Sequence, residues 1–156
     1  MSATHSPQVM EAIKHAIEQQ IGCTEALLAA MRSERGALLG GKLEELEQAC
    51  ADKLAAANKL QSLGAQLAQL QAAPRQIEAL LLRAPDSASA LARWRQLLGL
   101  AAACQQHNLE NGALLDQRQM QLRRTRRALL GDQAAPTYGR GGDSGYDPGR
   151  RSLASA

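Results

Sequence analysis

The apolar positions of the first forty or so residues follow the repeat of one long helix. Ser6-Pro7 is typical of an N-cap residue followed by proline at the first helical position. From Val9 to Met31, apolar residues then recur at steps of three and four, which is the spacing of one helix face. Gly40-Gly41 interrupts this spacing. The sequence therefore predicts a helix of about thirty residues that ends at the glycine pair.

A second helix is predicted to open at Lys42, with apolar positions that alternate by four and three residues as in a heptad repeat. The line consists of Leu46, Cys50, Lys53, Ala57, Leu60, Gly64 and Leu67, and it is widened by Leu43, Leu54, Leu63 and Leu70. Lys53 places a charge in this line. We interpret it as a side chain whose ammonium group reaches solvent past its own stem, with a buried functional charge as the alternative.

Ala73-Pro74 is predicted to stop the second helix. A short segment over residues 76–83 then carries Ile77, Leu80 and Leu81 on one side, and Pro85-Asp86-Ser87 supplies a break and a new cap. No proline follows until residue 136, so one helix of about 44 residues is predicted from Ser87 to Leu130. Its apolar line consists of Leu91, Trp94, Leu98, Ala101, Asn108, Leu115, Leu122 and Leu129.

The helical repeat ends at Gly131. Residues 131–156 hold six of the 13 glycines and two of the five prolines, and such a segment buries too little surface to offset its ordering entropy. We therefore expect a bundle domain over residues 1–130 and a flexible, disordered tail over residues 131–156. The expected fold is all-α: an elongated antiparallel helical bundle or coiled coil of three to four helices.

Composition agrees with this fold class. Hydrophobic residues make up 45% of the chain and aromatic residues only 2%, and the apolar content is mostly Ala and Leu, which favour helices. No apolar run is long enough to span a bilayer, and the first residues lack the pattern of a secretory signal. Three widely spaced cysteines are typical of reduced thiols. We expect a soluble, cytoplasmic protein without a membrane span.

Catalytic chemistry finds little support in the sequence. Cys104 and His107 could share a helix face as half of a metal site, but zinc needs at least three protein ligands and no second pair with such spacing exists. Glu44, Glu45 and Glu47 are explained by a solvated face. We therefore expect no enzymatic activity, no metal and no cofactor.

An arginine cluster is the sharpest charge feature, in a chain of net charge +3. It consists of Arg118, Arg123, Arg124, Arg126 and Arg127. Nucleic acid is one candidate partner, although no aromatic side chains interleave to stack bases. An anionic membrane or acidic partner is a second reading, and a solvated helix terminus that complements the macrodipole is a third.

The stretch that precedes this cluster places amides and a glycine where neighbouring turns carry leucine. Gln105, Asn108 and Asn111 supply the amides, and Gly112 costs about 1 kcal/mol relative to alanine inside a helix. In one account the amides fix the register of the bundle and Gly112 admits a close helix crossing. In the other, this is a weak point at which the last turns peel away and offer their leucines to a partner. Periodicity alone does not separate the two accounts.

Three stretches of the chain carry a resemblance to a known family. "GGKLEELEQACADK", "CQQHNLENGALLDQ" with the long helix that follows it, and "PTYGRGG" together resemble the FlgN family of flagellar type III export chaperones. The resemblance implies a small cytoplasmic chaperone that holds the hook–filament junction proteins FlgK and FlgL and helps to deliver them to the export gate. Nucleic acid is disfavoured as a partner, because no aromatic side chains lie among the arginines and the net charge is only +3.

The resemblance also implies roles for particular residues. The cargo segment in this family is C-terminal and amphipathic, and it binds beside the long last helix. We therefore expect the cargo-binding residues to be Asn111, Leu114, Leu115, Leu122, Leu129 and Leu130. The family's tail tyrosine is implicated in docking on the cytoplasmic domain of the gate component FlhA, and Tyr138 matches it by its Thr-Tyr-Gly setting. Tyr146 has no counterpart.

Two further hypotheses belong to other classes of protein. A structural coiled-coil scaffold or dimerisation module would self-associate weakly through the same leucines and would not need the tail. A basic nucleic-acid adaptor would act through the arginines, with binding that depends steeply on salt.

Overall fold

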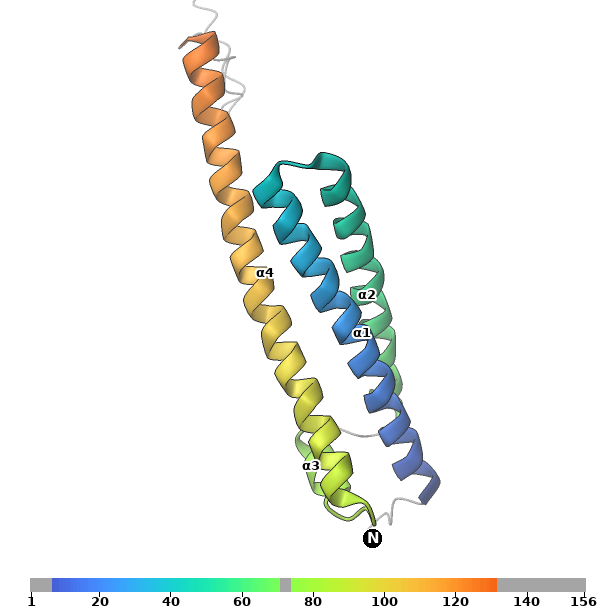
Figure 1. Ribbon diagram of the computed structural model, residues 1–156. Helices are drawn as coiled ribbons and strands as arrows, with labels where there is room; N and C mark the ends of the chain where they lie inside the picture. Colours follow the sequence, from blue (N-terminus) through green and yellow to red (C-terminus); the bar gives the residue numbers. More distant parts are fainter. Residues whose placement is uncertain (1–6, 71–73, 132–156) are drawn as a thin grey trace, which may run out of the picture. The chain divides into compact units, whose positions relative to one another are not determined.

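The structure is a computed structural model that describes residues 7–70 and 74–131 (Figure 1). These residues form four α-helices and no strand: α1 (Pro7–Gly40), α2 (Leu43–Gln69), α3 (Pro74–Leu81) and α4 (Ser87–Leu130). The predicted all-α fold is confirmed for this part of the chain. The predicted disordered tail falls, from residue 132 onward, outside the described residues.

The chain divides into two compact units, Met1–Arg118 and Gln119–Ala156. The described part of the first unit holds α1, α2, α3 and the larger part of α4. The described part of the second unit holds the last turns of α4 and Gly131. The division therefore falls inside α4, while the bundle domain expected from sequence ends with that helix.

The breaks between helices follow local sequence signals. Gly41 adopts a left-handed backbone conformation, with φ of 67°, which a residue without Cβ enters at little cost. The Lys42 N–H donates a hydrogen bond to the Ala37 carbonyl (3.1 Å), which closes the end of α1. Pro74 begins α3, at the position in a helix where its missing N–H is not needed. The predicted ends of the helices agree with the structure to within about two residues, except that α2 ends at Gln69, before the predicted stop at Ala73-Pro74.

Helix α1 lies between α2 and α4 in the first unit (Figure 1). It runs antiparallel to α2, to which the glycine turn joins it, and parallel to α4. The parallel direction follows from hydrogen-bonded pairs whose numbers rise together along both helices: Glu18 with Arg93, Met31 with Asn111 and Leu39 with Arg118. The alternation of directions from α1 to α2 to α4 is that of the expected antiparallel bundle.

Helix α3 closes the main apolar core of the first unit. Ile77, Leu80 and Leu81 are buried, so the predicted apolar side of this short helix is confirmed. They pack in one cluster with residues of the other three helices: Ile13, Ala16, Ile17, Ile21, Leu67, Ala90, Trp94 and Leu97. A second cluster joins α1 and α4 through Leu28, Met31 and Cys104.

The predicted apolar line of α2 is correct in part: Leu67 is buried, and Leu46, Lys53 and Leu60 are half-buried, but the positions between them are wrong. The buried residues of this helix are Ala49, Ala56, Leu63 and Leu67, whereas Cys50, Ala57 and Gly64 are exposed. Leu43 and Leu54, expected to widen the line, are exposed as well. Positions 49, 56 and 63 form a second heptad line one residue from the predicted one. Alanine at two of its positions lets α2 approach α1 closely.

The predicted line of α4 is displaced in the same way. Trp94 is buried as expected, but Leu98 and Asn108 are exposed, and Leu97 and Cys104 are buried in their place. The exposed side of α4 therefore keeps large apolar side chains, including Leu98 and Leu109. No described helix has a stretch long and apolar enough to cross a membrane.

Candidate protein-binding site

The leucines expected to bind cargo lie on α4, and most of them are exposed. In the first unit, Leu114 is half-buried and Leu115 is exposed. In the second unit, the exposed fractions are 69% for Leu122, 79% for Leu129 and 63% for Leu130. The described residues of the second unit are exposed without exception, and they include one large apolar side chain that was not among the expected cargo-binding residues, Met120. Burial of such side chains by a partner is favourable, at about 25 cal/mol per Å².

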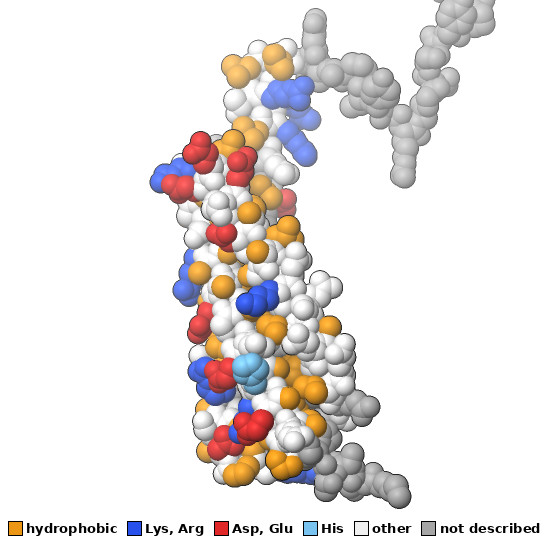
Figure 2. Space-filling model, turned by 90° about the vertical axis from the view of Figure 1, so that its right-hand side faces the viewer, with side chains coloured by type: hydrophobic (Ala, Val, Ile, Leu, Met, Phe, Trp, Pro, Cys, Tyr) orange, Lys and Arg blue, Asp and Glu red, His pale blue; other side chains and the backbone are white. Residues whose placement is uncertain are grey.

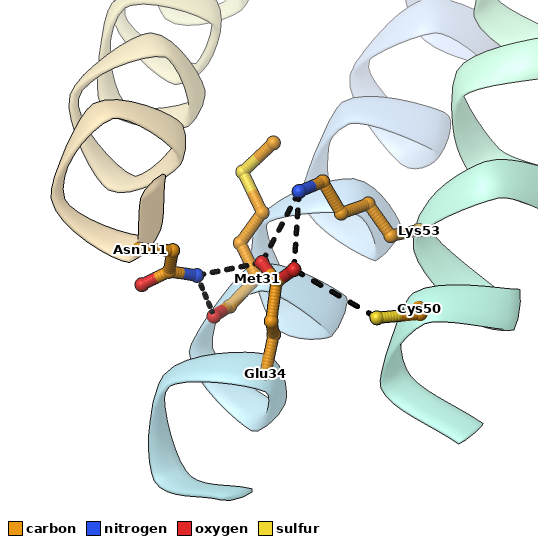
Figure 3. A network of polar contacts seen from close by, with 5 residues as sticks. All are labelled: Met31, Glu34, Cys50, Lys53 and Asn111. Atoms are coloured by element: carbon orange, nitrogen blue, oxygen red, sulfur yellow. Dashed lines mark hydrogen bonds and ion pairs between the residues drawn. The ribbon is translucent and has the colours of Figure 1, made fainter. Parts of the chain in front are cut away.

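Asn111 is placed differently from these leucines. Only 2% of it is exposed, and its side-chain Nδ2–H group donates to the Met31 carbonyl (2.8 Å) and to Glu34 Oε2 (2.8 Å) (Figure 3). Both acceptors belong to α1. Asn111 therefore lies in the interface between α1 and α4, where it fixes the position of α4 against α1, rather than on the exposed apolar surface.

Glu34 joins three helices through one carboxylate. Lys53 Nζ of α2 lies 3.2 Å from each Glu34 oxygen, on the other side of the carboxylate from Asn111 (Figure 3). The thiol of Cys50 lies 3.9 Å from Glu34 Oε1. The interpretation that Lys53 reaches solvent past its stem is wrong, because its ammonium group pairs with a carboxylate whose side chain is only 12% exposed.

We call Glu34, Lys53 and Asn111 the polar network. Glu34 was missed by the sequence analysis, although it continues the three- and four-residue spacing of the apolar side of α1 through Met31 to Leu38. Its two partners lie 19 and 77 residues away along the chain, so only the folded arrangement brings the three together. The Asn111 Oδ1 atom is buried without a hydrogen-bond partner among the described residues.

Asn111 is the last buried residue of α4. On either side of it along α4, polar contacts join α4 to α1 in the first unit. The Arg35 guanidinium pairs with Glu110 (2.8 Å), and Arg118 donates to the Leu39 carbonyl (3.1 Å). A hydrogen bond from Gln106 and the nearby charge of Arg35 lower the pKa of Glu110.

Gly112 does not make a close helix crossing. A Cβ atom built at this position would meet no atom within 4 Å, which contradicts the close crossing in the first of the two accounts. The register-fixing role expected of the amides is carried by Asn111, whereas Gln105 and Asn108 are exposed. Gly112 thus marks the point at which α4 passes from its last buried residue to its exposed turns.

Cys104 packs in the interior of the first unit. Its thiol donates to the Thr24 carbonyl (3.6 Å), and burial raises the pKa of the Cys104 thiol. In the described part of the chain, no three His, Cys, Asp or Glu side chains come together in a group that could hold a metal ion. Tyr138 and Tyr146 lie outside the described residues.

The described part of the chain thus defines a class, an all-α helical bundle whose long last helix carries exposed leucines. The family model described as FlgN protein matches residues 9–144, so the chain belongs to the FlgN family. This is a family of flagellar export chaperones, which bind flagellar export substrates. No curated protein and no solved structure was found to match the chain.

Proposed function

We propose that this protein is a cytoplasmic chaperone, without enzymatic activity, for hook–filament junction proteins of the FlgK and FlgL kind. It binds the C-terminal amphipathic segment of its cargo and delivers it to the flagellar export gate. The observation that carries the proposal is the exposure of Leu122, Leu129 and Leu130 on the last helix of a FlgN family member. Exposed leucines in a row along a helix are matched by the apolar stripe of another helix.

Recognition in this scheme is helix against helix. An amphipathic cargo helix presents apolar residues at steps of three and four, which matches the seven-residue spacing of Leu115, Leu122 and Leu129. Burial of one leucine contributes about 1.5–3 kcal/mol, so a few of them supply useful affinity. Asn111 contributes from inside the bundle by fixing α4 against α1.

We expect the double substitution Leu122→Ser and Leu129→Ser to weaken cargo binding at least about 100-fold, because two apolar contacts would be lost. Both residues are exposed, so the stability of the chaperone should change little. The measurement is calorimetric titration with the C-terminal segment of the junction protein from the same bacterium.

The matched control is Leu43→Ser with Leu54→Ser, which removes two exposed leucines from α2. It should bind cargo as the unsubstituted protein does. Equal losses in both variants, or no loss in either, would contradict the proposed site. Light scattering on the free protein addresses the alternative scaffold role: self-association that the α4 substitutions abolish, together with no affinity for cargo, would favour it.

Tyr138 is proposed as the contact with the cytoplasmic domain of the gate component FlhA. The family match ends at residue 144, so it includes Tyr138 in its Thr-Tyr-Gly setting and leaves Tyr146 out. Tyrosine offers a large contact area with few rotatable bonds, which is typical of binding hot spots.

Tyr138→Ala should therefore keep cargo affinity and weaken binding to the FlhA domain about tenfold or more. Tyr146→Ala is the control and should leave both affinities unchanged. Both affinities are measured by the same titration method. An equal loss of cargo and gate binding in Tyr138→Ala would reject the separation of the two sites.

A further inference from the structure

The last turns of α4 concentrate positive charge and contain no acidic residue of their own. No Asp or Glu occurs between Asp116 and Asp132, whereas Arg123, Arg124, Arg126 and Arg127 fall within five residues. All four are exposed. Arginines this close on one helix repel one another, which disfavours the arrangement unless an anion compensates it.

Basic residues in the first unit differ from these arginines in their ion pairing. Several of them pair with carboxylates: Arg35 with Glu110, Lys53 with Glu34, and Arg93 with Glu18. Within residues 7–70 and 74–131, none of the four arginines of the second unit takes part in an ion pair. Their charge is therefore available to a partner from outside this part of the chain.

The helical repeat places these charges beside the exposed leucines. Arg126 follows Leu122 by four residues and precedes Leu129 by three, so it lies next to both on the helix surface. Leu130 follows Arg127 by three residues, Arg126 by four and Arg123 by seven. A helix that covers these leucines brings the side chains along the edges of its own apolar stripe within reach of the guanidinium groups.

From this placement we infer that the arginines select a cargo helix that carries carboxylates beside its apolar stripe. The inference rests on the proposed function, because it assigns the charge of the helix that covers the leucines. Arginine suits this role, since its planar guanidinium group pairs with carboxylates in a bidentate geometry and keeps its charge at all physiological pH values. Such pairs accelerate encounter and penalise basic competitors.

Two other anionic partners fit the surface less well. Helices that lie on a membrane separate an apolar from a charged face, but here Arg126 stands between leucines and Met120 lies four residues before Arg124. Single-stranded nucleic acid is bound by aromatic side chains on which bases stack, and residues 119–131 contain none. An amphipathic helix with acidic flanks can contact both the leucines and the arginines that residues 119–131 expose.

The test replaces all four arginines with glutamine (R123Q/R124Q/R126Q/R127Q) in the full chain. Glutamine keeps the helical propensity and removes the charge. The matched control removes four exposed basic residues of the first unit that have no ion pair among the described residues (R32Q/K59Q/R75Q/R83Q), so both variants have the same net charge. The probe is the C-terminal segment of the junction protein, titrated at low and at high salt.

We expect the α4 variant to bind this segment roughly tenfold more weakly at low salt and to lose most of the salt dependence, while the control keeps both. Amide substitutions at the carboxylates that flank the apolar stripe of the segment should give the same loss. Unchanged affinity and salt dependence in the α4 variant, or equal losses in both variants, would overturn the inference. The inference would also be overturned if the arginine substitutions weakened binding to anionic lipid vesicles or to RNA but left the affinity for the junction-protein segment unchanged.

The leucine variants show whether a negative result rejects only the charge selection by the arginines or the proposed cargo site as well. If Leu122→Ser with Leu129→Ser abolishes binding while the arginine variant does not weaken it, the cargo site stands and the charge selection is wrong. If neither set of substitutions affects binding, the cargo site itself is wrong.

Discussion

Replacing Lys53 with methionine should lower the free energy of unfolding by about 2–3 kcal/mol, because the buried Glu34 carboxylate would lose its only cationic partner in the polar network. Removal of one member of a buried ion pair is costly, since the remaining charge is left in a poor solvent. The Lys53 side chain is 27% exposed, so we expect a smaller change than the roughly 3–5 kcal/mol typical of fully buried pairs. Urea denaturation followed by circular dichroism measures the change.

Two variants make this expectation specific. Adding Glu34→Gln to Lys53→Met should recover most of the stability, because the neutral amide oxygen can still accept the hydrogen bond from Asn111. Lys42→Met removes a lysine that pairs with Glu45 (2.8 Å) in an exposed position and should leave the unfolding midpoint nearly unchanged. If Lys53→Met is as mild as Lys42→Met, Glu34 is not held by this pair.

Leu81→Ala should destabilise the protein by about 3 kcal/mol, since Leu81 is 0% exposed and its truncation would leave a cavity in the main cluster. Its neighbour offers a matched control of the same residue type. Leu82 is 61% exposed, and Leu82→Ala should change the free energy of unfolding by less than about 0.5 kcal/mol. Thermal or urea unfolding of the two variants provides the comparison.

The contrast between these neighbours tests the role of α3. If Leu81→Ala and Leu82→Ala are equally mild, the short helix does not close the core and contributes little to folding. If both are severe, α3 is covered on both sides, contrary to its exposure in the structure.

Local signals made the helices predictable from sequence. Gly40-Gly41, Pro74 and Pro85 act on the backbone within a few residues, so the breaks that they cause do not depend on the rest of the fold. The phase of the apolar lines was not predictable in this way. In α2, the lines through Ala49 and Cys50 both follow a heptad repeat of small and apolar residues, and only packing against α1 decides between them.

The candidate site was predictable to a similar extent. The spacing of Leu122 and Leu129 singled out residues that the structure shows to be exposed, but spacing does not tell an exposed stripe from a buried one. Asn111 was grouped with these leucines because the family resemblance implies that cargo binds beside this helix. Its actual partner, Glu34, lies 77 residues away, and no local pattern reports a contact over that distance.

The position of Asn111 has a consequence for how α4 detaches from α1. Fraying of a helix proceeds from its end, and beyond Asn111 there is no buried side chain to slow it. The first buried contacts that fraying of α4 would have to break are the two hydrogen bonds from Asn111 to α1. Within the first unit, detachment of α4 from α1 should therefore break the hydrogen bonds of Asn111 before it exposes Trp94 or the core residues of α3.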